Sequence, residues 1–155
     1  MGRQQKGFSL VELMVALAIV GILAAISYPS YTGHMMKTRR VDAQGSLAGL
    51  SAAMERYFTE NNTYAGAAGT TSGGVVTPAD TGAPRIYPTQ SPIDGATKYY
   101  NLTISAADAS SYTLRATPIS TSTQASDKCA ILTLTSTGLR GAVTSGGTAI
   151  SGCWQ

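Results

Sequence analysis

The sequence predicts an α+β protein in which one long N-terminal helix packs its C-terminal half on an antiparallel sheet of about four strands. Three observations support this class: an apolar run near the start of the chain, an amphipathic stripe that continues it, and three later segments in which apolar and polar residues alternate. The length of 155 residues fits one domain.

The first expected element is an apolar helix from Phe8 to Tyr28, in which Glu12 is the single charged side chain. A helix of this length spans about 30 Å, the thickness of a bilayer core. A signal-peptide core is shorter and leads to a small-residue cleavage site, which is missing here. Because a carboxylate in hydrocarbon costs about 2.5–3.5 kcal/mol, Glu12 is a candidate functional residue. Gly21 and Pro29 are expected to weaken and kink the helix.

After Pro29 the same helix becomes amphipathic and is expected to end near Glu60. Its apolar residues recur at intervals of three and four and share one face, which is expected to pack on the sheet. They are Ala43, Leu47, Leu50, Met54 and Tyr57 or Phe58. The charged residues of this half are expected to face solvent or neighbouring molecules: Arg39, Arg40, Glu55 and Arg56.

The segment from Asn61 to Lys98 is rich in glycine, threonine and proline and is expected to form an exposed, flexible loop. Three strands should follow, because apolar and polar residues alternate in segments 100–104, 112–117 and 130–135. Their short polar connections favour an antiparallel meander. Residues 138–141 are expected to turn the chain into a short fourth strand.

The N-terminal segment Lys6-Gly7-Phe8-Ser9-Leu10-Val11-Glu12, with Gly21, Pro29 and Tyr31 after it, resembles the leader and N-terminal helix of class IVa type IV pilins. Later blocks resemble minor pilins of the PilE type. They are Glu55-Arg56-Tyr57, residues 100–104, 112–118 and 138–141, Cys129 with residues 132–134, and Cys153-Trp154. The glycine- and threonine-rich insert at 66–84 has no counterpart in this resemblance.

The resemblance implies a pilin-like fold and a processed chain. Residues 1–7 would be a leader that a prepilin peptidase cleaves between Gly7 and Phe8, with N-methylation of Phe8. Residues 8–28 would be a transmembrane helix that later enters the filament core. Residues 29–155, including the second half of the helix, would be the globular domain, which is periplasmic before assembly in the inner membrane and extracellular in the pilus. Glu12 would aid assembly by meeting the Phe8 amine of a neighbouring subunit.

Cys129 and Cys153 are too far apart for a C-x-x-C motif, and His34 alone cannot complete a zinc site with them. In an exported chain they are expected to form one disulfide. Two unpaired buried thiols are the alternative.

No enzyme, cofactor or metal site is expected, since His34 lies on the helix away from the strands and the aspartates sit in predicted turns. The expected function is a structural subunit, a minor pilin, of a type IV pilus that serves twitching motility, adhesion or DNA uptake. One alternative is a DNA-binding pilin-like receptor for natural transformation. Another is a pseudopilin of a type II secretion system.

The DNA alternative depends on a basic cluster at Lys37, Arg39 and Arg40. To bind DNA, this cluster would have to form one stripe with Lys98, Arg115 and Arg140. The simpler interpretation of the cluster is a solvated helix face with salt bridges between subunits.

Overall fold

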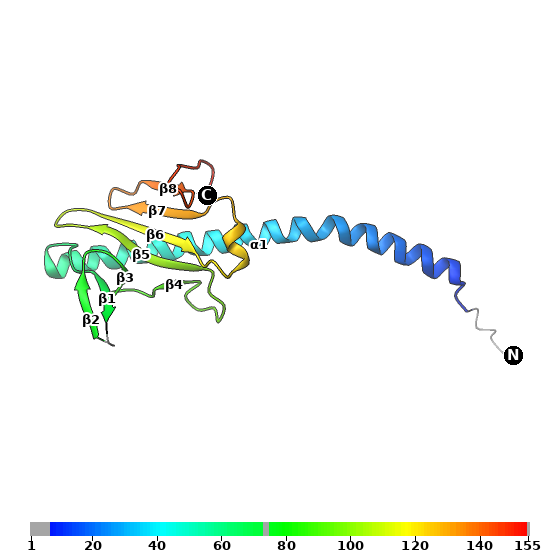
Figure 1. Ribbon diagram of the computed structural model, residues 1–155, viewed down its shortest axis with the longest axis horizontal. Coiled ribbons are helices and arrows are strands. Elements are labelled where there is room, and N and C mark those ends of the chain that lie inside the picture. The colour runs from blue at the N-terminus through cyan, green and yellow to red at the C-terminus, as the bar shows by residue number, and fades with distance from the viewer. Residues whose placement is uncertain (1–6, 73–74, 155) are drawn as a thin grey trace. The chain divides into compact units, whose positions relative to one another are not determined.

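The computed structural model describes residues 7–72 and 75–154, without the side chains of residues 29, 71, 72, 75 and 76. The chain divides into two compact units, unit 1, Met1–Met35, and unit 2, Met36–Gln155. The long helix α1, Leu10–Asn61, supplies most of the described part of unit 1 and the first element of unit 2 (Figure 1).

In unit 1, α1 carries its apolar side chains on the outside. Every large hydrophobic side chain from Phe8 to Ile26 is more than half exposed. This part of α1 is long and apolar enough to cross a membrane. The backbone is helical through both Gly21 and Pro29, so the expected kink stays a prediction.

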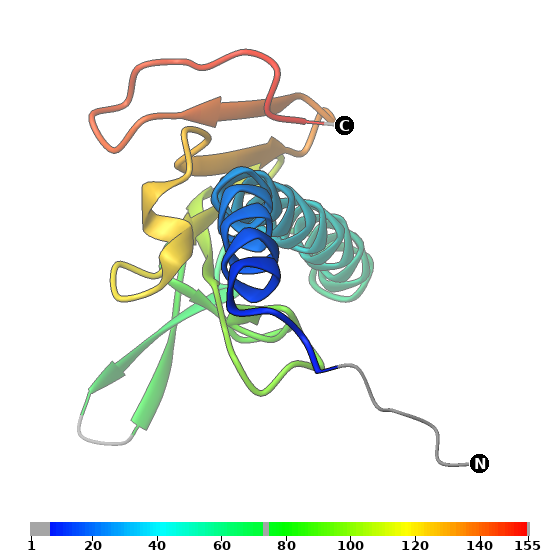
Figure 2. The same ribbon diagram turned by 90° about the vertical axis from the view of Figure 1, so that its right-hand side faces the viewer.

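Unit 2 contains a five-stranded antiparallel sheet in the order β4-β5-β6-β7-β8. The last four strands form the expected meander, and a short 3₁₀ helix, η1 (Thr123–Ser126), lies between β6 and β7. The bounds are β4 Gln90–Ser91, β5 Tyr100–Ala107, β6 Tyr112–Pro118, β7 Ile131–Thr135 and β8 Arg140–Val143. Two views show this sheet against one side of the C-terminal half of α1 (Figures 1 and 2).

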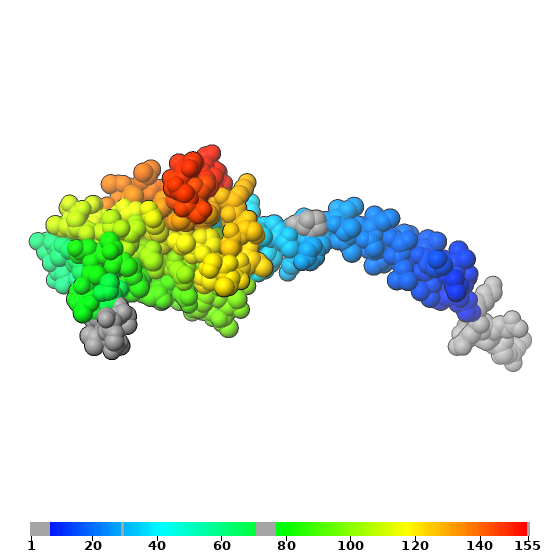
Figure 3. Space-filling view, viewed as in Figure 1, coloured from blue at the N-terminus to red at the C-terminus, as the bar shows by residue number. Residues whose placement is uncertain are grey.

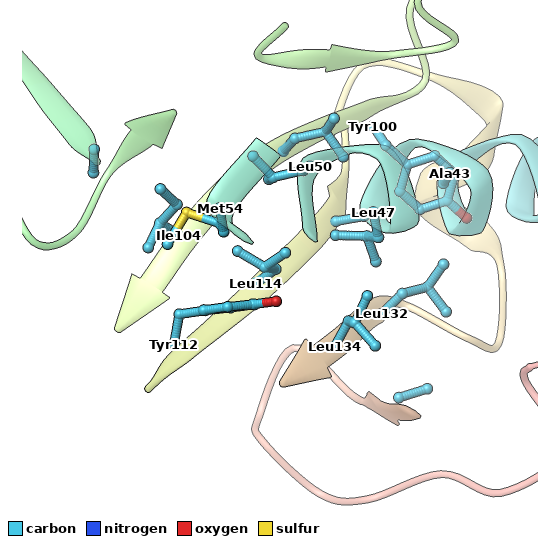
Figure 4. Packing of buried hydrophobic residues seen from close by; sticks show 14 of the residues in the cluster. Ala43, Leu47, Leu50, Met54, Tyr100, Ile104, Tyr112, Leu114, Leu132 and Leu134 are labelled. Carbon is cyan, nitrogen blue, oxygen red and sulfur yellow. The ribbon is translucent and has the colours of Figure 1, made fainter. Parts of the chain in front are cut away.

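The core lies between that half of α1 and the inner face of the sheet (Figure 4). The predicted stripe is confirmed, because Ala43, Leu47, Leu50 and Met54 are fully buried and Tyr57 and Phe58 pack at the edge. Alternation places the facing residues inside: Leu102, Ile104, Leu114, Leu132 and Leu134. Burying an aliphatic side chain of this size contributes about 1.5–3 kcal/mol.

The segment 61–98 differs from the expected loop. It contains a second antiparallel sheet in the order β2-β1-β3, formed by β1 Ala68–Ser72, β2 Val75–Ala79 and β3 Ala83–Pro84. Pro78 and Pro84 lie in the two edge strands, where a missing backbone N–H need not break a ladder. The prolines were therefore poor grounds for expecting a loop, and the main sheet also gains β4 from this segment.

Candidate functional site

The N-terminal motif lies at the start of α1 in unit 1. Gly7 and Phe8 precede the helix and are exposed, with Phe8 at 81%. Glu12 lies in the first turn of α1, where the positive end of the helix dipole favours a carboxylate. Residues 1–6 of the expected leader lie outside the described residues. Cleavage after Gly7, methylation of Phe8 and the assembly role of Glu12 stay predictions.

The basic cluster on α1 is divided by a buried ion pair. Arg40 donates from Nε and NH2 to Oδ2 and Oδ1 of Asp127, at 2.9 and 2.6 Å. Arg40 is only 8% exposed and Asp127 7%. The expectation that Arg40 faces solvent or an anionic partner is therefore wrong, since a bidentate carboxylate already neutralises it. The pairing of Asp127 with Arg40 was not predicted from the sequence. The position of Asp127, two residues before Cys129, was only a weak indication of this role.

Gln124 of η1 extends this pair into a network. Its Nε2 lies 2.8 Å from Asp127 Oδ2, 2.9 Å from the Tyr100 hydroxyl and 3.1 Å from the Met36 carbonyl oxygen. Burial, and then the Asp127 carboxylate, raise the pKa of Tyr100 to about 12. The network fixes η1 against the start of α1 in unit 2.

Three basic side chains lie beside this network, and we call them the basic end: Lys37, Arg39 and Lys128. Lys37 and Lys128 are exposed, and they flank Arg40 and Asp127 along the chain. The Arg39 guanidinium stacks 3.9 Å from the centre of the Tyr99 ring, next to Lys98, and donates to Thr123 Oγ1 at 2.6 Å. In the space-filling view, atoms of the η1 region and of α1 adjoin here (Figure 3).

A disulfide joins Cys129 to Cys153, as expected, with 5.7 Å between the Cα atoms. Gln44 Nε2 donates to the Cys153 carbonyl oxygen at 2.8 Å, and Trp154 Nε1 donates to the Gly141 carbonyl oxygen at 2.6 Å. The C-terminal segment is thereby held to both α1 and β8.

Residues 29–133 match the protein family described as "Type IV minor pilin ComP, DNA uptake sequence receptor", which is more than half of the chain. The chain belongs to this family. It is a type IV pilin, and residues 2–28 also match the prokaryotic N-terminal methylation motif.

Individual relatives of the chain include a fimbrial protein, a major pilin and a type II secretion protein. The chain is 37% identical over 75 residues to "Fimbrial protein EcpC" of Eikenella corrodens, covering 44% of this chain and 49% of that protein. It is 40% identical over 74 residues to "Type IV major pilin protein PilE1" of Neisseria gonorrhoeae, covering 44% and 45%. It is 36% identical over 63 residues to "Type II secretion system core protein G" of Pectobacterium carotovorum subsp. carotovorum, covering 41% and 40%. The alignments thus span about half of each relative or less.

Among solved structures, the chain is similar to the non-core minor pilin PilV of Neisseria meningitidis. The TM-score is 0.48 at 22% identity, and the match covers 76% of this chain and 96% of that one.

In this ComP-family pilin, the remaining predicted cations do not extend the basic end into one stripe. Lys98 Nζ donates to the carbonyl oxygens of Pro92 and Ile93, at 2.7 and 2.8 Å. Arg115 is exposed on β6, whereas Arg140 on β8 lies 5.5 Å from the ring of Trp154. Among the described residues, no group of three or more His, Cys, Asp or Glu side chains is placed to hold a metal ion.

A carboxylate that sequence reasoning placed in solvent joins the helix to the sheet of this pilin. Glu55 accepts hydrogen bonds from the hydroxyls of Tyr64 and Tyr112, at 3.0 and 2.9 Å. Burial raises the pKa of Tyr112 to about 12. The two tyrosine rings contact each other edge to face with 4.8 Å between centroids. The Glu55 residue as a whole is exposed to solvent, so its exposure alone does not indicate these two hydrogen bonds.

Proposed function

We propose that this pilin is a minor subunit of a type IV pilus that contacts DNA at its basic end. The observation that carries the proposal is the match of residues 29–133 to a family described as a DNA uptake sequence receptor. The exposed cations beside η1 are the part of unit 2 best suited to an anionic partner, because phosphate neutralisation by lysine and arginine dominates DNA affinity.

The subunit role rests on the N-terminal motif. A peptidase cuts between Gly7 and Phe8 and methylates the new amine. The apolar helix holds the chain in the inner membrane, with unit 2 in the periplasm, until it enters the filament. There the Phe8 amine of one subunit pairs with Glu12 of another, which offsets the cost of a carboxylate in an apolar environment.

The distribution of charge supports the location of the DNA contact. Loss of the leader removes Arg3 and Lys6 and lowers the net side-chain charge from +3 to +1, so DNA binding requires a local excess of cations. The exposed Asp42 and Asp94 line a groove of about 360 Å³. Phosphates are repelled there, and the DNA track therefore lies on the η1 side.

A salt-dependent gel shift with the full-length chain in detergent micelles tests this contact. The chain with Lys37→Gln and Lys128→Gln should bind a short duplex more weakly. The negative slope of log K against log salt should become shallower by about 1.8, because each of the two lost phosphate contacts contributes about 0.9 to its magnitude. Arg115→Gln is the matched control, an exposed cation on β6. An equal loss in the control, or no loss in the double variant, contradicts the location.

The secretion pseudopilin is the second candidate, favoured by the similarity to the type II secretion protein. Co-purification distinguishes the two roles. A pilus subunit should co-purify with surface pili, and a pseudopilin should co-purify with a secretion complex.

A further inference from the structure

One turn of α1 contacts both of the segments that the disulfide joins. Arg40 and Gln44 are four residues apart on the helix, so their side chains lie on the same face. Both are less than one-tenth exposed. Arg40 acts on the Cys129 side and Gln44 on the Cys153 side, although the two cysteines are separated by 24 residues.

The contact to Cys129 runs through Asp127. The Arg40 guanidinium fixes the Asp127 carboxylate through two hydrogen bonds, and Asp127 Oδ1 accepts the backbone N–H of Cys129 at 3.2 Å. Gln124 donates to the other carboxylate oxygen at 2.8 Å. The position of Cys129 relative to α1 is therefore set by hydrogen bonds that do not involve its sulfur.

The contact to Cys153 is direct. Gln44 Nε2 donates to the Cys153 carbonyl oxygen at 2.8 Å, and the side chain is buried while doing so. A buried amide is expensive to leave unpaired, so Gln44 favours conformations in which the C-terminal segment lies on the helix. The contact uses the backbone of Cys153 and does not involve its sulfur.

We propose that the Arg40–Gln44 turn of α1 aligns the two thiols before they are oxidised, so that the fold directs formation of the disulfide. Cys129 and Cys153 are held by α1 as reduced thiols, and the covalent bond then secures an arrangement already present. The inference does not rest on DNA binding or on filament assembly.

The chemistry requires an external disulfide, such as a thiol–disulfide oxidoreductase or oxidised glutathione. The thiolate of one cysteine attacks that disulfide, which forms a mixed disulfide and releases one thiol of the oxidant. The second thiolate then attacks the mixed disulfide, forms the Cys129–Cys153 bond and releases the second thiol. Two protein thiols are oxidised and one external disulfide is reduced to two thiols. The alignment acts on the second, intramolecular attack.

The test measures the equilibrium between the full-length chain and glutathione in detergent micelles, with the thiol and disulfide forms counted by mass after alkylation. This equilibrium gives the effective concentration of one protein thiol at the other, which is the tendency of the pair to form the disulfide relative to glutathione. Gln44→Met should lower this effective concentration about fivefold, the effect of one lost hydrogen bond. Gln90→Met is the control, because Gln90 donates to Asn101 on the sheet and does not contact a cysteine segment. An effective concentration in Gln44→Met equal to that of the unmodified chain overturns the proposal, as does an equal fall in the control.

A second measurement keeps the test independent of that variant. In a Cys153→Ser chain, which cannot form the disulfide, the Cys129 amide should remain protected from hydrogen exchange because Asp127 still accepts it. If this amide exchanges as fast as in an unfolded peptide while the Leu132 amide in β7 stays protected, the disulfide places Cys129 and the proposal fails.

Discussion

The Arg40 guanidinium and the Asp127 carboxylate form a bidentate pair with distances of 2.6 and 2.9 Å, and both side chains are less than one-tenth exposed. The pair connects the first turns of α1 in unit 2 with the segment between η1 and Cys129. Removing one member of a buried pair leaves the other desolvated and uncompensated, which costs more than the pair contributes as a whole.

The first prediction concerns this pair. Asp127→Ala should lower the free energy of unfolding by about 3–5 kcal/mol, because Arg40 then remains buried without a counter-ion. Replacing both, as Arg40→Met with Asp127→Leu, should cost less than Asp127→Ala alone. Denaturant unfolding in micelles, followed by the fluorescence of Trp154, measures both, and Asp94→Ala at an exposed position is the control. A double variant as unstable as the single one contradicts the interpretation.

The second prediction compares two glycines of α1. A Cβ on Gly49 would lie 2.8 Å from Cζ of Tyr87 and overlap its hydroxyl, whereas a Cβ on Gly45 would meet no heavy atom within 4 Å. Gly45→Ala should therefore stabilise unit 2 by about 0.5–1 kcal/mol through helix propensity. Gly49→Ala should lose that gain because Tyr87 must move.

Tyr87→Ala tests the cause of this difference. Combined with Gly49→Ala, it should restore the gain, measured relative to Tyr87→Ala alone by the same unfolding experiment. Equal effects of the two glycine substitutions would show that Tyr87 does not restrict Gly49.

The third prediction is the alkaline behaviour of Tyr100. Its pKa is about 12 in the folded chain against an ordinary value of 10.0. Between these pH values the unfolded chain loses a proton that the folded chain keeps, so the free energy of unfolding falls as pH rises from about 10 to about 12. The stabilisation that the neutral Tyr100 side chain contributes is fully present below about pH 10.

Tyr100→Phe should make this fall shallower, and Tyr31→Phe at an exposed site of unit 1 should not. Unfolding free energies measured at several pH values between 9 and 12, on the order of half a unit apart, give the slopes. Identical slopes for Tyr100→Phe and the unsubstituted chain would contradict the assigned pKa.

The fourth prediction concerns Glu12. Glu12→Ala should leave membrane insertion intact, since it removes a charge from an apolar helix, but should deplete the subunit from filaments about tenfold or more. Loss of one charged hydrogen-bonded contact is sufficient for a change of that size. Immunoblots of membranes and sheared pili measure both, with Glu60→Ala near the end of α1 as the control. Normal incorporation of Glu12→Ala would exclude the pairing with Phe8.

Local periodicity predicted most of the fold. The stripe from Ala43 to Met54 and the alternation in β5, β6 and β7 indicate which face of each element is buried. The structure confirms both patterns. The β1–β2–β3 sheet was missed because threonine and glycine fit both loops and short strands. Whether a proline lies in an edge strand depends on a pairing that the sequence does not contain.

The candidate site was predicted less completely. The pattern of Gly7, Phe8 and Glu12 lies within six residues of sequence, and the match of residues 2–28 to the methylation motif covers it, whereas the roles of these residues stay predictions. Arg40, by contrast, is neutralised by Asp127, 87 residues away in the chain. Contacts of this kind arise from the tertiary fold, and a run of basic residues cannot reveal which of its members is already paired.

The most direct test of the account is the N-terminal mass of this subunit in filaments sheared from the cell surface. We expect it to begin at N-methylated Phe8, at a small molar ratio to the main subunit. A chain in those filaments that still carries Met1 to Gly7 would contradict the account.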